Sequence, residues 1–255
     1  MEYTVAAVDE ALGLLVIVAS QPGLGVTELA RRSGNTKARA FRLLCTLEGR
    51  GFVERHGDPA VYKLGHQALL MGVAANEQIS LVSRAQRYMR ELHDLFNELV
   101  QVRVRDGLET VCVALVDSTQ DVRVSTHVGR RRPLYAGSSG KVHLAFASED
   151  IRQAVLTSEL QRFTPNTLTQ RSKLLQELNK VRTQGYATSI SEVSLDIKSV
   201  AAPVRDSSGE VIATLGLSSP ASRTDDKLMK SFVDAVVSRA NSLSRDLGAA
   251  LSAAA

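Results

Sequence analysis

In the first 66 residues, apolar positions follow a helical period and then an alternating one. Three helices are expected, over residues 8–20, 28–33 and 36–50. Two short strands, over 52–55 and 61–64, should form a hairpin around a turn that contains Pro59. Helix, helix, turn, helix and hairpin, in that order, are typical of a winged helix-turn-helix domain that binds DNA.

The third of these helices has two chemically different faces. One face is an apolar stripe of Ala40, Leu43, Leu44 and Leu47. The other face belongs to a basic segment, residues 31–42, which contains five Lys or Arg residues and no acid. A recognition helix offers such a face to the major groove. The residues that we expect to contact DNA are Arg32, Thr36, Lys37, Ala38, Arg39, Phe41 and Arg42.

The net charge of the chain is compatible with DNA binding but does not establish it. The chain carries +4 with a pI near 9.2, which allows a polyanionic partner. Residues 1–66 carry eight Lys or Arg against seven Asp or Glu, a net charge of only +1. A small helical domain with a solvated basic face is therefore the simpler alternative. The order of the elements and the placement of the basic residues favour double-stranded operator DNA.

The first helix also has an unusual composition, because residues 11–19 contain no charged side chain. A helix that is apolar around most of its circumference must be covered on more than one side. One side can pack on its own domain. The other is available to a second subunit, so we expect a dimer.

The remainder of the chain indicates a linker and a second domain. Apolar residues recur at three- and four-residue intervals from Ile79 to Phe96, as in an amphipathic helix. Strands are expected over 100–105, 111–115, 122–126, 186–190, 199–204 and 211–217. Helices are expected over 140–146, 148–156, 172–184 and 225–247. The predicted α+β organisation is a winged helix-turn-helix in 1–66, a helical linker in 67–98, and an antiparallel sheet flanked by helices in 99–255.

Composition excludes several other classes. A chain of 255 residues is long enough for two domains with separate cores. No apolar stretch is long enough to cross a bilayer, and no basic-then-apolar signal peptide is present, so a cytoplasmic protein without a membrane partner is expected. Cys45 and Cys112 lie far apart and without metal-ligand spacing, so we expect reduced thiols, no metal site and no cofactor.

Short motifs in order along the chain indicate a family. They lie at residues 7–12, 29–32, 42–47, 128–130, 133–134, 140–141, 185–186, 200–204 and 218–220, followed by Arg223. With these motifs the chain resembles the IclR-type transcriptional regulators over almost its whole length. The resemblance implies a GAF-like effector-binding domain and assembly into dimers or dimers of dimers.

A candidate ligand site lies at Gly137-Ser138-Ser139-Gly140-Lys141, directly before a predicted helix. Free backbone N–H groups and two hydroxyls there favour an anion. A phosphate loop is excluded, because Tyr135 stands where glycine is needed and Val142 where a hydroxyl is needed. A helix cap without a ligand is the alternative.

The resemblance implies the rest of the effector pocket. The expected lining is Ser138, Ser139 and Gly140 with Leu115, Ser189, Ile197, Ser199 and Ser218. These residues carry no charge, and a small carboxylate such as an aromatic or keto acid would fit them. The chain departs from many members of the family at Thr36, Ala38, Arg39, Ser189, Asp196 and Ser199. Its operator and its effector therefore cannot be taken from a relative.

Two rival classes remain. A GAF-like domain can house an enzyme, but a thiol reductase needs paired cysteines and a serine hydrolase needs a nucleophile elbow, G-x-S-x-G, which the sequence lacks. His127 and His143 have no recognisable acid and nucleophile beside them. We expect no catalytic residues. A DNA-binding protein without any ligand is the second alternative. The favoured function is a DNA-binding transcriptional regulator whose operator affinity responds to a small organic acid.

Overall fold

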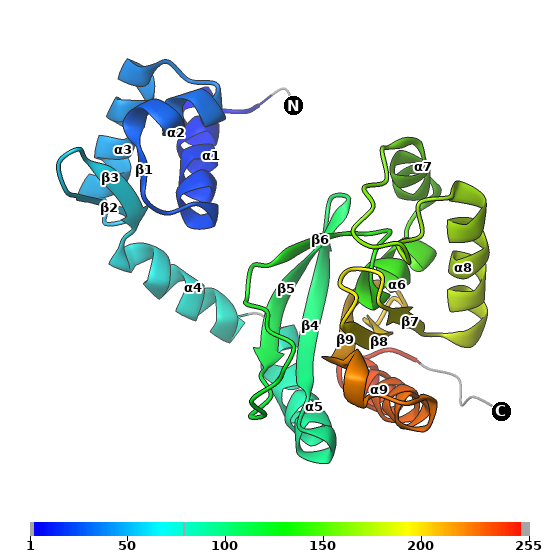
Figure 1. Cartoon of the computed structure of the whole chain (residues 1–255). Helices are drawn as coiled ribbons and strands as arrows, with labels where there is room; N and C mark the ends of the chain where they lie inside the picture. The colour runs from blue at the N-terminus through cyan, green and yellow to red at the C-terminus, as the bar shows by residue number, and fades with distance from the viewer. Residues whose placement is uncertain (1–2, 79, 251–255) are drawn as a thin grey trace. The chain divides into compact units, whose positions relative to one another are not determined.

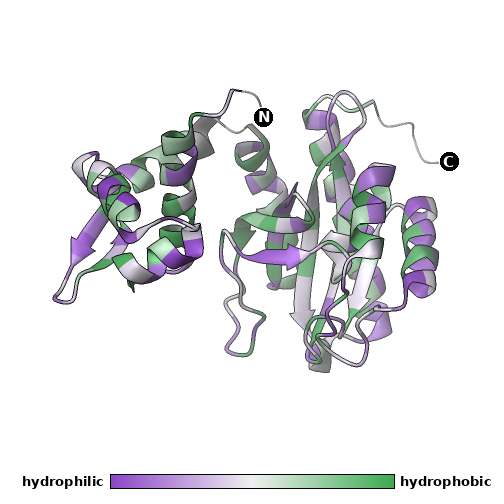
Figure 2. Cartoon of the chain, turned by 90° about the horizontal axis from the view of Figure 1, so that it is seen from above, coloured by the Kyte–Doolittle hydropathy of each residue, from purple (hydrophilic) through white to green (hydrophobic). Residues whose placement is uncertain are grey.

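The computed structural model describes residues 3–78 and 80–250 of the chain (Figure 1). Their contacts divide the chain into two compact units, Met1–Ile79 and Ser80–Ala255. In both units the helices carry hydrophobic residues beside hydrophilic ones (Figure 2), as expected for helices with one buried face. No helix among the described residues has the length and apolar character needed to cross a membrane.

The first unit is a small helical domain with a three-stranded sheet. Its elements are α1 (Ala6–Ser20), β1 (Leu24–Gly25), α2 (Val26–Ser33), α3 (Lys37–Gly49), β2 (Val53–His56), β3 (Val61–Leu64) and α4 (His66–Gln78). The strands lie in the order β1-β3-β2, and both pairings are antiparallel. The winged helix-turn-helix is thereby confirmed. Strand β1 was not predicted, because a two-residue strand leaves no periodic signal.

The helix-turn-helix forms because its turn and its core agree with the sequence pattern. Gly34 takes a left-handed conformation (φ 68°) at the end of α2, which a residue with a Cβ adopts only with strain. Thr36 then caps α3 by accepting a hydrogen bond from the Arg39 N–H at 3.3 Å. The three helices share a buried core of Leu14, Val18, Leu29, Ala30, Ala40, Leu44 and Leu47.

The second unit contains one antiparallel sheet with helices on both faces. Its elements are α5 (Ser80–Phe96), β4 (Leu99–Asp106), β5 (Glu109–Val116), β6 (Arg131–Pro133), α6 (Ser138–Phe146), α7 (Glu149–Thr157), α8 (Arg171–Gln184), β7 (Ala187–Ile190), β8 (Ile197–Arg205), β9 (Val211–Pro220) and α9 (Asp226–Asp246). The strand order is β6-β5-β4-β9-β8-β7. Every pairing between neighbouring strands is antiparallel.

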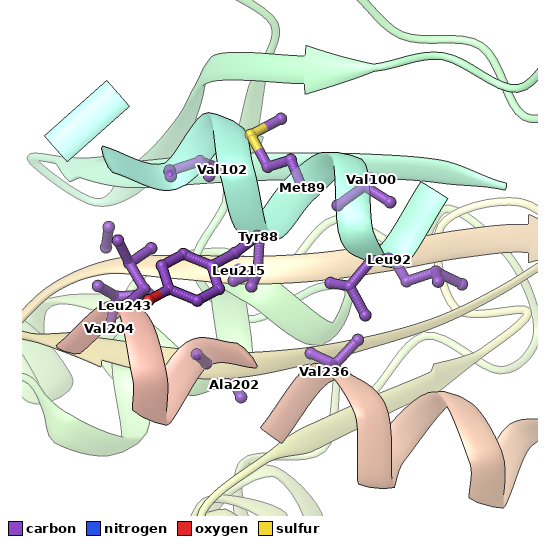
Figure 3. Packing of buried hydrophobic residues seen from close by; sticks show 14 of the residues in the cluster. Tyr88, Met89, Leu92, Val100, Val102, Ala202, Val204, Leu215, Val236 and Leu243 are labelled. Carbon is purple, nitrogen blue, oxygen red and sulfur yellow. The ribbon is translucent and has the colours of Figure 1, made fainter. Parts of the chain in front are cut away.

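The two faces of this sheet bury different clusters. Helices α5 and α9 pack on one face through residues such as Tyr88, Leu92 and Val236 (Figure 3). Helices α6, α7 and α8 cover a second cluster that includes Leu134, Val142 and Leu178. On β4, Val100 and Val102 belong to the first cluster, so the alternate residues Gln101 and Arg103 lie on the opposite, α6 side.

The second unit and the segment that leads into it differ from the sequence-based predictions in three respects. The strand predicted over 122–126 is wrong, because this segment contains no strand in the structure and Val122 is exposed. Its place beside β5 is taken by β6, where Arg132 pairs with Thr110. The Arg-Arg-Pro sequence of β6 has no apolar alternation from which a strand could be predicted. The segment expected as one linker contains two helices, and α5 packs into the core of the second unit.

Candidate DNA-binding surface and effector cavity

The basic face predicted on the third helix is exposed in the first unit. All seven candidate residues are exposed: Arg32, Thr36, Lys37, Ala38, Arg39, Phe41 and Arg42. The opposite side of α3 is buried through Ala40, Leu44 and Leu47. The structure therefore groups the candidates on the accessible part of α3 and the adjacent end of α2, where a duplex can reach them.

Ion pairs divide this basic face into two classes of residue. Arg39 pairs with Glu10 of α1, and Arg32 pairs with Glu28 at 2.6 Å. Hydrogen bonds from Arg31 and Arg32 lower the pKa of Glu28 to about 2. Within residues 3–78, Lys37 and Arg42 have no such acidic partner among the side chains described. Of the five basic residues in segment 31–42, Lys37 and Arg42 are thus the two whose charge is not already paired with a carboxylate among the described side chains of this unit.

The β2–β3 hairpin adds a basic residue that the sequence analysis did not select. Arg55 lies on β2 and is exposed, and no ion pair to it is found among the described side chains of the first unit. Glu54 beside it accepts from His56 at 3.1 Å and lies 3.5 Å from Lys63. The signal available in the sequence was a lone arginine on a predicted hairpin. A wing residue of this kind can reach the phosphate backbone.

The second unit contains a cavity between the sheet and the N-terminal end of α6. It encloses about 100 Å³, whereas one water needs about 10–15 Å³ by the same measure, so a small molecule fits. Seven of the eight predicted lining residues do line it: Ser138, Ser139, Gly140, Ser189, Ile197, Ser199 and Ser218. Leu115 is not part of the lining. Leu115 lies on β5 and is paired with the lining residue Gln101 of β4, so it lies beside the cavity.

The cavity also contains charge, and the expectation of an uncharged lining is therefore wrong. Arg103 on β4 and Arg132 on β6 both line it. Arg103 is 4% exposed, and burial together with the nearby Arg132 and Arg130 lowers its pKa to about 10. The alternation of polar Gln101 and Arg103 along a strand could have indicated a polar face. Arg132 could not have been found, because β6 was not predicted.

A buried ionic cluster lies at the N-terminal end of α6, beside the cavity. Glu192 accepts a hydrogen bond from the Gly137 N–H at 3.3 Å and also pairs with Lys141, whose amine lies 3.1 Å from Glu177. Burial raises the pKa of Glu192, although Lys141 opposes this shift. Ser138 Oγ lies 2.9 Å from Ser199 Oγ, which connects α6 to the sheet. A protein carboxylate therefore already occupies part of this helix N-terminus.

His143 lies in α6 and contacts β4, the strand from which Arg103 lines the cavity. Its Nε2 lies 3.2 Å from the carbonyl oxygen of Arg103, and burial lowers its pKa to about 4. The imidazole is therefore neutral at neutral pH. Of the two cysteines, Cys45 is an exposed free thiol and Cys112 is a buried one. The described residues contain no group of three side chains arranged to hold a metal ion.

Comparison with protein families matches both units of the chain. Residues 7–57 match the family described as the IclR helix-turn-helix domain, and residues 73–245 match the family described as the bacterial transcriptional regulator IclR C-terminal domain. Among curated proteins, the HTH-type transcriptional regulator KdgR of Escherichia coli is 31% identical over 96% of this chain and 94% of its own. The regulator KipR of Bacillus subtilis is 31% identical over 94% and 96%. These relatives are named as regulators, and none of them as an enzyme.

Solved structures show the same fold. An IclR-type regulator from Silicibacter sp. TM1040 superposes with a TM-score of 0.88 at 26% identity, covering 96% of this chain and 98% of its own. An IclR homologue from Microbacterium hydrocarbonoxydans, solved in complex with 4-hydroxybenzoate, has a TM-score of 0.82 at 23% identity, covering 94% and 98%. Both the order of domains and the fold of each are thus shared with solved regulators.

Proposed function

The chain belongs to the IclR family of bacterial transcriptional regulators, and from this premise we propose that a small organic acid, bound in the cavity of the second unit, changes its affinity for operator DNA. The helix-turn-helix domain and the C-terminal effector-binding domain are those of the family. The identity of the effector class is our proposal. The observation that carries it is the cavity itself, which combines serine hydroxyls with two arginines.

The lining supports an acid rather than a neutral or cationic ligand. Hydroxyls from α6, β7, β8 and β9 can donate to oxygen atoms. Arginine guanidinium groups form strong, often bidentate hydrogen bonds with carboxylates. A protein of the same fold has been solved in complex with 4-hydroxybenzoate, which is a carboxylic acid.

DNA contact is proposed through the N-terminal half of α3, with Lys37 and Arg42 as principal contacts and Arg55 at the wing. Thr36, Ala38, Arg39, Phe41 and Arg32 complete the surface. Support comes from their exposure on the side of α3 opposite to its buried stripe. This is the orientation in which a recognition helix enters the major groove.

We propose that a second copy of the chain packs against the exposed apolar side of α1. Val8, Leu12 and Val16 follow one another at four-residue spacing, and each side chain is more than half exposed. Such a stripe on a helix matches the contact between two antiparallel or crossing helices. Two recognition helices in a dimer would read half-sites about one helical turn, or a multiple of it, apart. Leu12→Glu should give a monomer by light scattering, whereas Val122→Glu, also at an exposed apolar residue, should not.

The path from cavity to DNA is proposed to run through α5. This helix packs on β4, whose residues Leu99, Gln101 and Arg103 line the cavity only a few positions after α5 ends at Phe96. At its other end α5 follows α4, the last helix of the first unit. A displacement of β4 on ligand binding therefore reaches α5 directly.

A thermal-shift screen of organic acids on the full chain tests the proposed cavity. An acid that raises the melting temperature of the wild type should have no effect on Ser139→Leu, because leucine fills space beside the α6 N-terminus. Ser172→Leu on the exposed surface of α8 is the matched control and should respond like the wild type. A Ser139→Leu variant that is stabilised as strongly as the wild type would place the ligand site elsewhere.

A further inference from the structure

The connection between β5 and β6 borders the cavity without belonging to the sheet. Val124, Ser125 and Thr126 line the cavity, and Ser125 is also exposed, so this connection lies between the cavity and solvent. We name residues 117–126 the flap. Within the described part of the chain, the flap makes no hydrogen bond from backbone to backbone. A segment held in this way can be displaced without breaking a strand ladder.

One attachment of the flap is Asn97, the residue that directly follows α5. Its side-chain amide donates to Thr119 Oγ1 at 2.8 Å and accepts from the Thr119 N–H at 3.0 Å. Its carbonyl oxygen accepts from Ser118 Oγ at 2.7 Å and from Gln120 Nε2 at 3.0 Å. Asn97 has a left-handed backbone (φ 49°), which asparagine adopts more readily than most residues with a Cβ. The flap is thus tied to the point where α5 ends and β4 is about to begin.

The second attachment is Arg223, which follows β9. Its Nη1 donates to the carbonyl oxygen of Val122 at 2.6 Å. Its Nε and Nη2 donate to the two carboxylate oxygens of Glu98 at 2.6 and 2.8 Å. Glu98 is 2% exposed and lies between Asn97 and the first residue of β4. Because such a bidentate pair fixes the geometry of both side chains, Arg223 connects the flap to the same junction through Glu98.

These two residues are the attachments of the flap. Among the described residues, every hydrogen bond between the flap and the rest of the chain is made with Asn97 or Arg223. We infer that the flap is a movable wall of the cavity and that Asn97 and Arg223 are positioning residues of the effector response. A molecule that enters the cavity displaces the flap, and the flap in turn displaces the junction of α5 and β4. This inference rests on the proposed function above and adds a second route to α5 beside the one through β4.

The loop between β7 and β8 also borders the cavity and provides a comparison. Val193 of this loop lines the cavity. The carbonyl oxygen of Glu192 accepts from Thr167 Oγ1 at 2.7 Å, which ties the loop to the connection between α7 and α8. Ser191 in this loop has φ 57° and is, with Asn97, one of the two residues other than glycine with a positive φ in the described chain. Glycine can adopt this backbone without strain, so the same substitution at Ser191 and Asn97 gives a matched pair of variants.

A covalent probe tests the inference on the full chain without an effector or DNA. In a Cys45→Ser background, Val124→Cys places a thiol on the cavity side of the flap, and Cys112 stays buried. Iodoacetamide then adds a carbamidomethyl group, because the thiolate displaces iodide. Hydrogen–deuterium exchange is measured by mass spectrometry before and after the addition. Exchange of the amides in residues 93–98 should change by about fivefold or more, the lower end of typical couplings.

Further substitutions in this background separate positioning from folding. Asn97→Gly keeps the left-handed backbone but removes the side-chain link to Thr119, so the change should shrink to about twofold or less. Adding Glu98→Gln with Arg223→Met should abolish it, and this pair leaves no buried charge unpaired. Ser191→Gly is the matched control and should keep the full change. Asn97→Asp should also keep it, because aspartate still accepts from the Thr119 N–H and tolerates the left-handed backbone.

Three results would overturn the inference. The first is an adduct that leaves the exchange of residues 93–98 unchanged. The second is the same change with and without the substitutions at Asn97, Glu98 and Arg223. The third is a thiol at position 124 that does not react in the folded chain, since the flap would then not admit even a small molecule. In each case an acid found by the thermal-shift screen would leave the proposed function standing, whereas a failed screen would remove that function and leave the measured link from flap to α5.

Discussion

Basic side chains lie in opposite surroundings in the two units of this regulator. On the first unit, the arginines of α2 and α3 are exposed, and Arg31, Arg32 and Arg39 lie against acids. In the second unit, Arg103 is buried without an acid, and Arg132 is half-buried without one among the described residues. Exposed pairs contribute little free energy, so their cations can exchange a carboxylate for a phosphate. A buried cation without an acid is an arrangement that the proposed acid ligand would complete.

This difference separates two kinds of anion recognition in one chain. A polyanion is met by a solvated surface, where counterions are released and salt weakens binding. The proposed effector acid would instead bind inside a cavity, where screening by salt is much weaker. The predictions below test that contrast in order of decreasing effect.

Salt should separate the two activities most strongly. Between about 50 and about 200 mM salt, the affinity for operator DNA should fall by about a thousand-fold or more if about six phosphates are contacted. The affinity for the effector acid should change by less than about tenfold over the same range. Fluorescence anisotropy with labelled DNA and calorimetry with the acid measure the two slopes. If the two affinities depended equally on salt, the proposed difference between the DNA surface and the cavity would be wrong.

Acid should destabilise the second unit through His143. Burial lowers its pKa from 6.5 to about 4, so below pH 6.5 the unfolded chain takes up a proton that the folded chain does not. Above pH 6.5 the buried neutral imidazole costs no stability. As the pH falls from 6.5 towards 4, the free energy of unfolding decreases by roughly 3 kcal/mol in total. Urea denaturation at about pH 7 and about pH 5 measures it. His143→Gln should reduce this dependence of the free energy of unfolding on pH, whereas His127→Gln, at an exposed position, should not.

Arg42 should contribute more to DNA binding than an arginine at the other end of the same helix. Arg42→Ala should weaken operator binding by roughly 1–3 kcal/mol if it reads a base edge. Arg50→Ala, beyond the C-terminal end of α3, should have a much smaller effect. If Arg42 contacts a phosphate, the loss is instead seen mainly in the salt slope. If the two variants lost the same affinity for operator DNA, α3 would not be the recognition helix.

The smallest effect is expected at the exposed pair between α1 and α3. Glu10→Gln removes the partner of Arg39 and leaves that guanidinium available to DNA. The affinity for DNA should rise by no more than about 1 kcal/mol, the usual upper value for such a pair. Competition titrations with wild-type protein can resolve a change of this size. A loss of affinity would show that Glu10 orients Arg39 toward DNA.

The sequence predicts those features that depend on local periodicity. The helices of the first unit were found because Leu14, Leu29 and Leu44 lie on regular apolar faces, and the exposed candidates on α3 followed from the same stripe. The ion pair of Arg39 with Glu10 spans 29 residues, so only the tertiary fold brings it together. Arg132 was missed because β6 is an edge strand without a pattern. The side of β4 on which Arg103 lies could be predicted from the alternation, but its burial depends on the tertiary fold.

The central claim is that the cavity and the DNA surface are thermodynamically coupled, and reciprocity is its most direct test. Operator affinity is measured by anisotropy with and without the effector acid, and acid affinity by calorimetry with and without operator DNA. We predict that the two ratios are equal, each corresponding to a coupling free energy of about 1–3 kcal/mol, and that both fall to unity in Ser139→Leu. An acid that binds the wild type but leaves its operator affinity unchanged would contradict the claim.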